Sequence, residues 1–184
     1  MCLEKYIVEQ CAPTLASLKT GTLFGVMEND AQELMLQVSR WQRELSAKGL
    51  ILILLRYRNG RALIYLGRLS QLARDLSAPG AEKLLKRCGY EALDIEGALK
   101  CLRERVCTQD IFPHEIGLFL GYPIDDVIGF MRYGGKGSKY TGCWQVYGDV
   151  QEAAEKFSRY RKCSKIYKRL YGEGLGLKQL TVSA

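Results

Sequence analysis

The chain has 184 residues, 47% of them hydrophobic and 26% charged, with a formal net charge of +7. These values are ordinary for a globular domain and exclude a disordered or fibrous chain. The longest continuous apolar run, Leu50 to Leu55, is far shorter than the roughly 18–20 residues that span a bilayer. The seven cysteines include no CxxC pair, which argues against a disulfide framework or a zinc ribbon. The first ten residues contain two glutamates and no signal-peptide apolar core, so we expect a cytoplasmic protein.

The excess of basic over acidic side chains is confined to the C-terminal part of the chain. Residues 1–130 carry sixteen basic and sixteen acidic side chains, whereas residues 131–178 carry eleven basic and four acidic ones. Such asymmetry favours an anionic partner, whether nucleic acid, a phosphate ligand or an acidic protein, although a solvated basic helix face has the same composition. The candidate contacts for this partner are Arg159, Arg161, Lys162, Lys165 and Arg169.

Two helices are predicted in the first fifty residues. A short helix from Leu3 to Cys11 is expected to end before Pro13, because proline disfavours a helical residue in front of it. One or two short strands follow. A longer helix is expected to begin at Asn29 or Asp30, which are typical capping residues, and to end at Gly49.

A β-hairpin is predicted next. Leu50 to Tyr57 and Ala62 to Leu66 are rich in strand-forming residues, and the Asn59-Gly60 pair between them is typical of a type I′ turn. Since Leu50 to Leu55 is continuously apolar rather than alternating, we expect this strand to be covered on both faces and to lie centrally in its sheet.

Helices dominate the rest of the predicted structure. Five are expected, at Leu69–Ser77, Pro79–Arg87, Asp94–Val106, Pro113–Leu120 and Pro123–Tyr133. A long basic helix is expected from a capping box at Asp149 and Glu152 to Tyr171, with an inner stripe that includes Val150. Short strands are expected at Trp144–Tyr147 and Leu177–Val182.

Together these elements predict an α/β (α+β) fold in which several helices flank a small central sheet that includes the Asn-Gly hairpin. We treat residues 1–184 as a single domain, because no linker or internal repeat is visible. Its functional part is expected to comprise a two-helix corner at 113–133, a Gly/Lys loop at 134–142 and the basic helix at 149–171.

The two-helix corner has the spacing of a helix-turn-helix. In IGLFLGYPIDDVIGFM, apolar residues and Gly121 stand where that motif places its packing residues and its turn. This spacing predicts entry into a DNA groove, or simply a structural corner. Asp125 and Asp126 argue against DNA, because carboxylates in the first turn of a recognition helix repel phosphates.

The loop GGKGSKYTG has the glycines and lysines of an anion-binding segment. It is not a Walker A loop, because Lys136 is followed by Gly137 rather than Ser or Thr. Its backbone amides, with Lys136 and Lys139, nevertheless suit an anion, although a plain surface connection has the same composition.

His114 is the chain's only histidine, and it is a candidate for metal binding or catalysis. The second histidine of an HExxH motif is missing, so His114 needs Cys143, Cys107 or Cys163 as a partner to hold a metal or haem. A nucleophilic site needs Cys143 or Ser138 next to His114, with a carboxylate such as Asp149. No complete catalytic signature surrounds these residues, so an enzyme is the less favoured interpretation.

The segments HEIGLFLGYPIDDVIGFMRYGGKG and GCWQVYGD resemble the bacterial domain-of-unknown-function family numbered 3793, which occurs mainly in anaerobic Firmicutes. CAPTLASLKTGTLF and LLRYRNGRAL resemble other segments of that family, so the resemblance covers nearly the whole chain. Members are encoded at times near ferrous-iron transport and flavodoxin genes. The resemblance therefore implies a role in iron or redox homeostasis, with iron or haem as the cofactor and a flavodoxin-like acidic protein as a partner.

We therefore expect a binding protein that holds an anionic ligand or partner near residues 113–149. Lys136 and Lys139 are expected to hold the anionic group. The pocket is expected to be shaped by His114, Tyr122, Cys143 and Trp144. The alternative is a nucleic-acid-binding protein that uses the two-helix corner and the basic helix.

Overall fold

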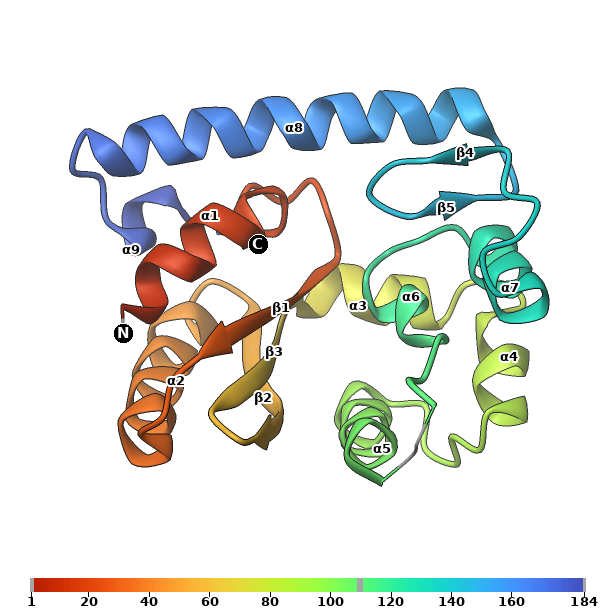
Figure 1. Ribbon diagram of the computed structural model, residues 1–184, viewed down its shortest axis with the longest axis horizontal. Coiled ribbons are helices and arrows are strands. Elements are labelled where there is room, and N and C mark those ends of the chain that lie inside the picture. Colours follow the sequence, from red (N-terminus) through yellow and green to blue (C-terminus); the bar gives the residue numbers. More distant parts are fainter. Residues whose placement is uncertain (1, 109–110, 184) are drawn as a thin grey trace.

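A three-stranded antiparallel sheet in the order β1-β3-β2 lies between two groups of helices (Figure 1). The structure is a computed structural model that describes residues 2–108 and 111–183. Its strands are β1 (Gly21–Met27), β2 (Leu50–Arg58), β3 (Arg61–Arg68), β4 (Tyr140–Thr141) and β5 (Gln145–Val146). Its helices are α1 (Leu3–Leu15), α2 (Ala31–Ser46), α3 (Leu69–Leu76), α4 (Ala81–Arg87), α5 (Ile95–Thr108), α6 (Ile116–Phe119), α7 (Ile124–Tyr133), α8 (Val150–Gly172) and α9 (Leu177–Leu180). The α+β fold predicted from the sequence is confirmed.

The β2–β3 hairpin forms as predicted, but its first strand is not central. Asn59 and Gly60 have φ angles of 51° and 73°, as a type I′ turn requires. Because β3 pairs with both other strands, β2 is an edge strand and the prediction of a central position is wrong. The apolar run in β2 has another cause, since α2 packs against one of its faces and α5 against the other.

The two faces of the sheet belong to different cores. Along β3, Ile64 and Leu66 point into a core shared with α1, α2 and α9. Tyr65, between them, points into a second core shared with α3 to α6. This alternation is the two-residue period of a strand. The sheet therefore separates a core close to both chain ends from a core that supports residues 113–133.

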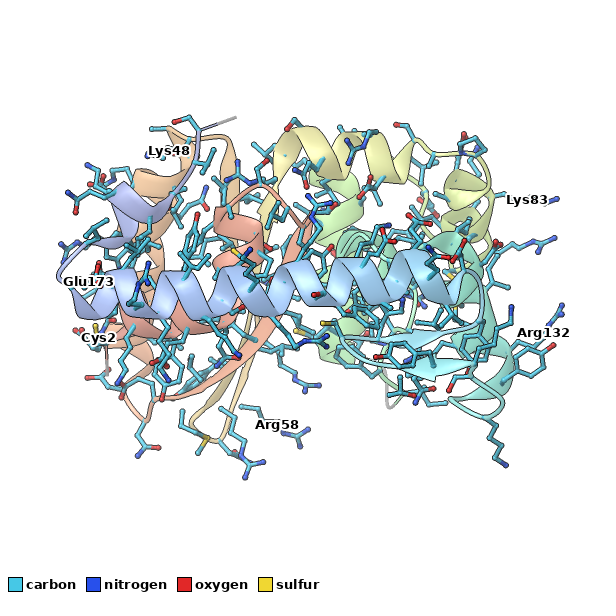
Figure 2. All side chains as sticks on the ribbon, turned by 90° about the horizontal axis from the view of Figure 1, so that it is seen from above. Cys2, Lys48, Arg58, Lys83, Arg132 and Glu173 are labelled. Carbon is cyan, nitrogen blue, oxygen red and sulfur yellow. The ribbon has the colours of Figure 1, made fainter. Side chains whose placement is uncertain are left out.

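The long helix α8 joins both halves of the molecule. Its 23 residues extend over roughly 35 Å at the helical rise of about 1.5 Å per residue. Asp149 accepts a 2.9 Å hydrogen bond from the backbone N–H of Glu152, which confirms the N-cap half of the predicted capping box. The Glu152 side chain instead forms an ion pair with Lys156. Val150, expected on the inner stripe, is instead exposed. Figure 2 looks down on α8, which crosses the molecule from the Glu173 end to the Arg132 end.

The helix α1 continues two residues beyond Pro13, so the predicted end at Cys11 is wrong. Pro13 lies in the last turn, where its missing N–H leaves only the carbonyl of Glu9 without a helical partner. Glu9 is exposed, so water can reach that carbonyl. The backbone N–H groups of Leu18 and Lys19 both donate to the Pro13 carbonyl and close the helix end.

The predicted strand at 177–182 is also wrong, because this segment contains α9. Leu177 and Leu180, three residues apart, are both buried, which is the spacing of a helical turn. The Glu4 side chain accepts a 2.9 Å hydrogen bond from the Leu177 N–H and ties α9 to α1. Elsewhere, α4 begins only after Gly80, and the first helix of the corner is the single turn α6. None of the helices in the described residues is long and apolar enough to cross a membrane.

Candidate ligand pocket

A pocket of about 260 Å³ lies between the α6–α7 corner and the short β4–β5 hairpin, which we call the aromatic pocket. The hairpin lies between the N-terminal half of α8 and the corner (Figure 1). The side chains and glycines that line it are His114, Ile116, Gly117, Tyr122, Asp126, Val127, Phe130, Thr141, Gly142, Cys143, Trp144 and Gln145. The four pocket residues expected from the sequence, His114, Tyr122, Cys143 and Trp144, are thus brought together.

Asp126 fixes the hairpin to the corner. It lies in the first turn of α7 and is 3% exposed. One carboxylate oxygen accepts the indole N–H of Trp144 at 2.7 Å, and the other accepts the backbone N–H groups of Tyr147 and Gly148 at 2.7 and 2.8 Å. A buried carboxylate with three donors is well satisfied. Asp126 therefore does not face outward, as the helix-turn-helix interpretation assumed, but holds the pocket together.

Aromatic rings form the walls of the pocket. Tyr122 stacks on Trp144 with ring centroids 4.6 Å apart, and Trp144 meets Phe157 of α8 edge-to-face at 4.4 Å. On the other side, the exposed His114 ring contacts Phe130 edge-to-face at 4.9 Å. Burial, with smaller contributions from Cys143 and Tyr160, raises the pKa of Tyr122 to about 12. The Tyr122 hydroxyl therefore stays neutral at physiological pH.

Gln145 contributes an unsatisfied polar atom to this apolar site. Its side-chain oxygen is buried and accepts no hydrogen bond from the described residues. Gly135, with a φ of 91°, packs so closely that an added Cβ would lie 2.7 Å from this oxygen. Gly135 therefore helps to position Gln145, whose side-chain oxygen is left without a donor among the described residues.

The lysines of the glycine loop lie outside the pocket lining. The Lys139 ammonium donates to the carbonyl of Gly148 at 3.0 Å, and Lys136 is exposed. Both therefore contribute no side-chain contact to the aromatic pocket. The loop instead serves the site through Gly135, which allows the close approach to Gln145.

The geometry separates the candidate metal and nucleophile residues. His114 and Cys143 line the same pocket, but Cys163 is buried in α8 and Cys107 lies at the end of α5. Among the described residues, no three His, Cys, Asp or Glu side chains are grouped as a metal site. Asp149 caps α8 and does not line the pocket. Ser138, in the glycine loop, lies near Thr141 and also outside the lining.

A second pocket, of about 320 Å³, shares Cys143 with the first, and we call it the basic pocket. Its lining residues are Gln10, Pro13, Lys19, Thr22, Cys143, Tyr160, Arg161, Ser164 and Lys165. Of the five predicted anion contacts on α8, Arg161 and Lys165 line this pocket and the other three lie on the exposed surface of the helix.

Sequence reasoning missed Lys19, Gln145 and the role of Asp126. Lys19 lies in the loop between α1 and β1, and its ammonium is 5.4 Å from the Tyr122 ring centroid. No local motif identifies Lys19, because the cations that share its pocket, Arg161 and Lys165, lie more than 140 residues away in the chain. The signal for Asp126 was its position in the first turn of α7, which also suits a helix start.

The fold and the pockets define an α+β protein with a small aromatic pocket at the joint of a helical corner and a hairpin. Within that class, the chain belongs to the family described as "Protein of unknown function (DUF3793)", whose model matches residues 7–181. The family resemblance of the sequence is thereby confirmed. No curated protein and no solved structure matches the chain.

Proposed function

We propose that the protein binds a compact, flat organic ligand in the aromatic pocket, and that this ligand carries at least one N–H or O–H donor. The observation that carries the proposal is the unsatisfied side-chain oxygen of Gln145, a residue that lines the aromatic pocket. A buried acceptor without a partner is rare and costs about 1–3 kcal/mol. A ligand donor that reaches this oxygen recovers that energy.

The size and rigidity of the pocket support a small ring system. Drug-sized ligands occupy roughly 300–1,000 Å³, and the pocket of about 260 Å³ is slightly smaller. The stacked rings of Tyr122 and Trp144 form a preorganised apolar wall, and aromatic contacts contribute about 0.5–1.5 kcal/mol beyond their buried area. Because Asp126 already holds Trp144 in place, little ordering is needed when the ligand binds.

Iron and haem, which the family resemblance implies, are less well supported than an organic ligand. His114 and Cys143 are the two side chains of the pocket that suit a soft or borderline metal, and the described residues add no third ligand to them. A haem is also larger than the ligands that a pocket of about 260 Å³ accommodates. The proposal therefore does not depend on a metal.

Indole and benzofuran are suitable probes, because they share a bicyclic shape and only indole carries an N–H donor. We expect indole to bind about 3–10-fold more tightly than benzofuran in a calorimetric or NMR titration, the value of one neutral hydrogen bond. Substitution Gln145→Met should remove this difference. Equal affinities for both probes in the unsubstituted protein would contradict the role of Gln145.

The aromatic wall is tested by a matched pair of tyrosines. Tyr122→Leu removes the ring that stacks on Trp144 and should weaken indole binding about tenfold. Tyr133→Leu removes a half-exposed ring that stacks on Tyr147 outside the pocket, and should change the affinity less than about twofold. The proposal fails if indole does not bind, or if both substitutions weaken it equally.

A further inference from the structure

We propose that the basic pocket binds an oxyanion of the phosphate class through Lys19, Arg161 and Lys165. Three cations from two elements line this pocket, and no carboxylate is among the described residues that line it. The site adjoins the aromatic pocket at Cys143 but uses different cationic side chains, and the inference stands if the proposed function is wrong.

Lys19 is the central observation. It is partly buried, and among the described residues no carboxylate lies within ion-pair distance of its ammonium. Its contact is with the face of the Tyr122 ring. Burial lowers the pKa of Lys19, and Cys11 and Cys143 oppose this effect. A cation that is partly removed from water without an anion is costly, and a bound anion offsets that cost.

Arg161 and Lys165 complete the charge of the pocket. They lie one helical turn apart on α8, so their side chains project from the same face toward the α1–β1 segment. Neither is paired with a carboxylate among the described residues, whereas Lys156 and Arg169 on the same helix are paired with Glu152 and Glu173. An arginine fork with two lysines suits a doubly charged, tetrahedral oxyanion.

Neutral donors surround these cations. Gln10, Thr22, Tyr160 and Ser164 line the same pocket and carry amide or hydroxyl groups. Burial raises the pKa of Tyr160 to about 12, with Cys143 adding to the shift and Arg159 opposing it, so its hydroxyl stays protonated at neutral pH. The pocket thus offers both charge and hydrogen-bond donors to an oxyanion.

The test uses inorganic phosphate, with two double substitutions that remove the same charges from one helix. Arg161→Met with Lys165→Met removes the α8 side of the pocket and should weaken phosphate binding about tenfold or more in a calorimetric titration. Arg159→Met with Lys162→Met removes one arginine and one lysine outside the lining and should weaken it less than about threefold. Lys19→Met should weaken phosphate binding about as much as the first pair.

Three outcomes would overturn the inference. Phosphate could fail to bind the unsubstituted protein at all. The two double substitutions could weaken phosphate binding equally, which would identify a diffuse basic face instead of a pocket. Tight, steeply salt-dependent binding of a short single-stranded oligonucleotide would then show that this face binds nucleic acid. Lys19→Met could leave phosphate affinity unchanged in a protein whose circular dichroism and thermal unfolding show that it is folded.

Discussion

Arg68 and Lys19 are both withdrawn from water, and their surroundings differ. Arg68, at the end of β3, is 1% exposed. It donates to the carbonyls of Thr14, Leu15 and Val182 at 2.6, 2.5 and 2.7 Å. Lys19, in the loop between α1 and β1, contacts the Tyr122 ring and lines the basic pocket. Arg68 therefore stabilises the fold by closing the C-terminal end of α1, whereas the ammonium of Lys19 remains available to a ligand.

The largest expected effect is the loss of Arg68. Arg68→Met removes a buried guanidinium that donates to three carbonyls, of which those of Thr14 and Leu15 keep backbone donors from Ser17 and Val182. It should lower the free energy of unfolding by about 2–4 kcal/mol. Urea unfolding followed by circular dichroism measures this change. Arg58→Met, at the exposed tip of the hairpin, is the matched control and should change stability by less than about 0.5 kcal/mol. A similar small change for Arg68→Met would show that its hydrogen bonds do not support the fold.

A smaller effect is expected at Asp126. Its carboxylate holds the hairpin against the corner by hydrogen bonds, as the Arg68 guanidinium holds the end of α1. Asp126→Asn replaces one accepting oxygen by an amide that faces a donor, and should cost about 1–3 kcal/mol. In a Trp41→Phe background, Trp144 is the only tryptophan, and its fluorescence should shift to longer wavelength as the hairpin loosens. Its exposed neighbour is the control, because Asp125→Asn should leave both stability and emission unchanged. Equal effects of the two substitutions would contradict the anchoring role of Asp126.

The half of the molecule around Arg68 could largely be predicted from local patterns. These patterns depend on residues close in sequence. They are the Asp30 cap, the Asn59-Gly60 turn and the helical spacing of apolar residues. The errors arose where tertiary contacts decided the outcome. The apolar run of β2 reflects two covering helices and not a central position. The turn at Leu177 is helical because both of its leucines enter the core beside α1.

The pockets could be predicted only in part, for a related reason. His114, Tyr122, Cys143 and Trp144 lie within thirty residues of each other, so a dense segment of sequence indicated the aromatic pocket. The basic pocket brings Lys19 next to α8 residues that are more than 140 positions away in the sequence, and no local motif predicts this contact. The glycines of the 134–142 loop suggested an anion-binding loop. A loop that binds phosphate and a loop that lets Gln145 pack closely both require glycine, so the sequence does not distinguish them.

The smallest expected effect has the opposite sign to that of Arg68. Lys19→Met removes a desolvated cation and should raise the free energy of unfolding at pH 7 by about 0.5–2 kcal/mol, while phosphate binding weakens about tenfold or more. Lys5→Met, on the exposed side of α1, is the control and should be neutral within about 0.5 kcal/mol. A destabilised Lys19→Met protein would mean that the ammonium supports the fold.

The pH dependence of the stability gained by Lys19→Met tests whether the buried charge is its cause. Burial lowers the pKa of Lys19 in the folded state below its ordinary value of 10.5, so between the two values the unfolded chain binds more protons. The stability of the unsubstituted protein therefore rises with pH in that window, relative to Lys19→Met. The neighbouring groups Cys11, Cys143 and Tyr122 are present in both proteins, so the difference between the two proteins reports on Lys19. The difference in unfolding free energy should thus be full at pH 7 and shrink toward pH 10. A difference that stays constant would mean that a packing change, and not the buried charge, is responsible.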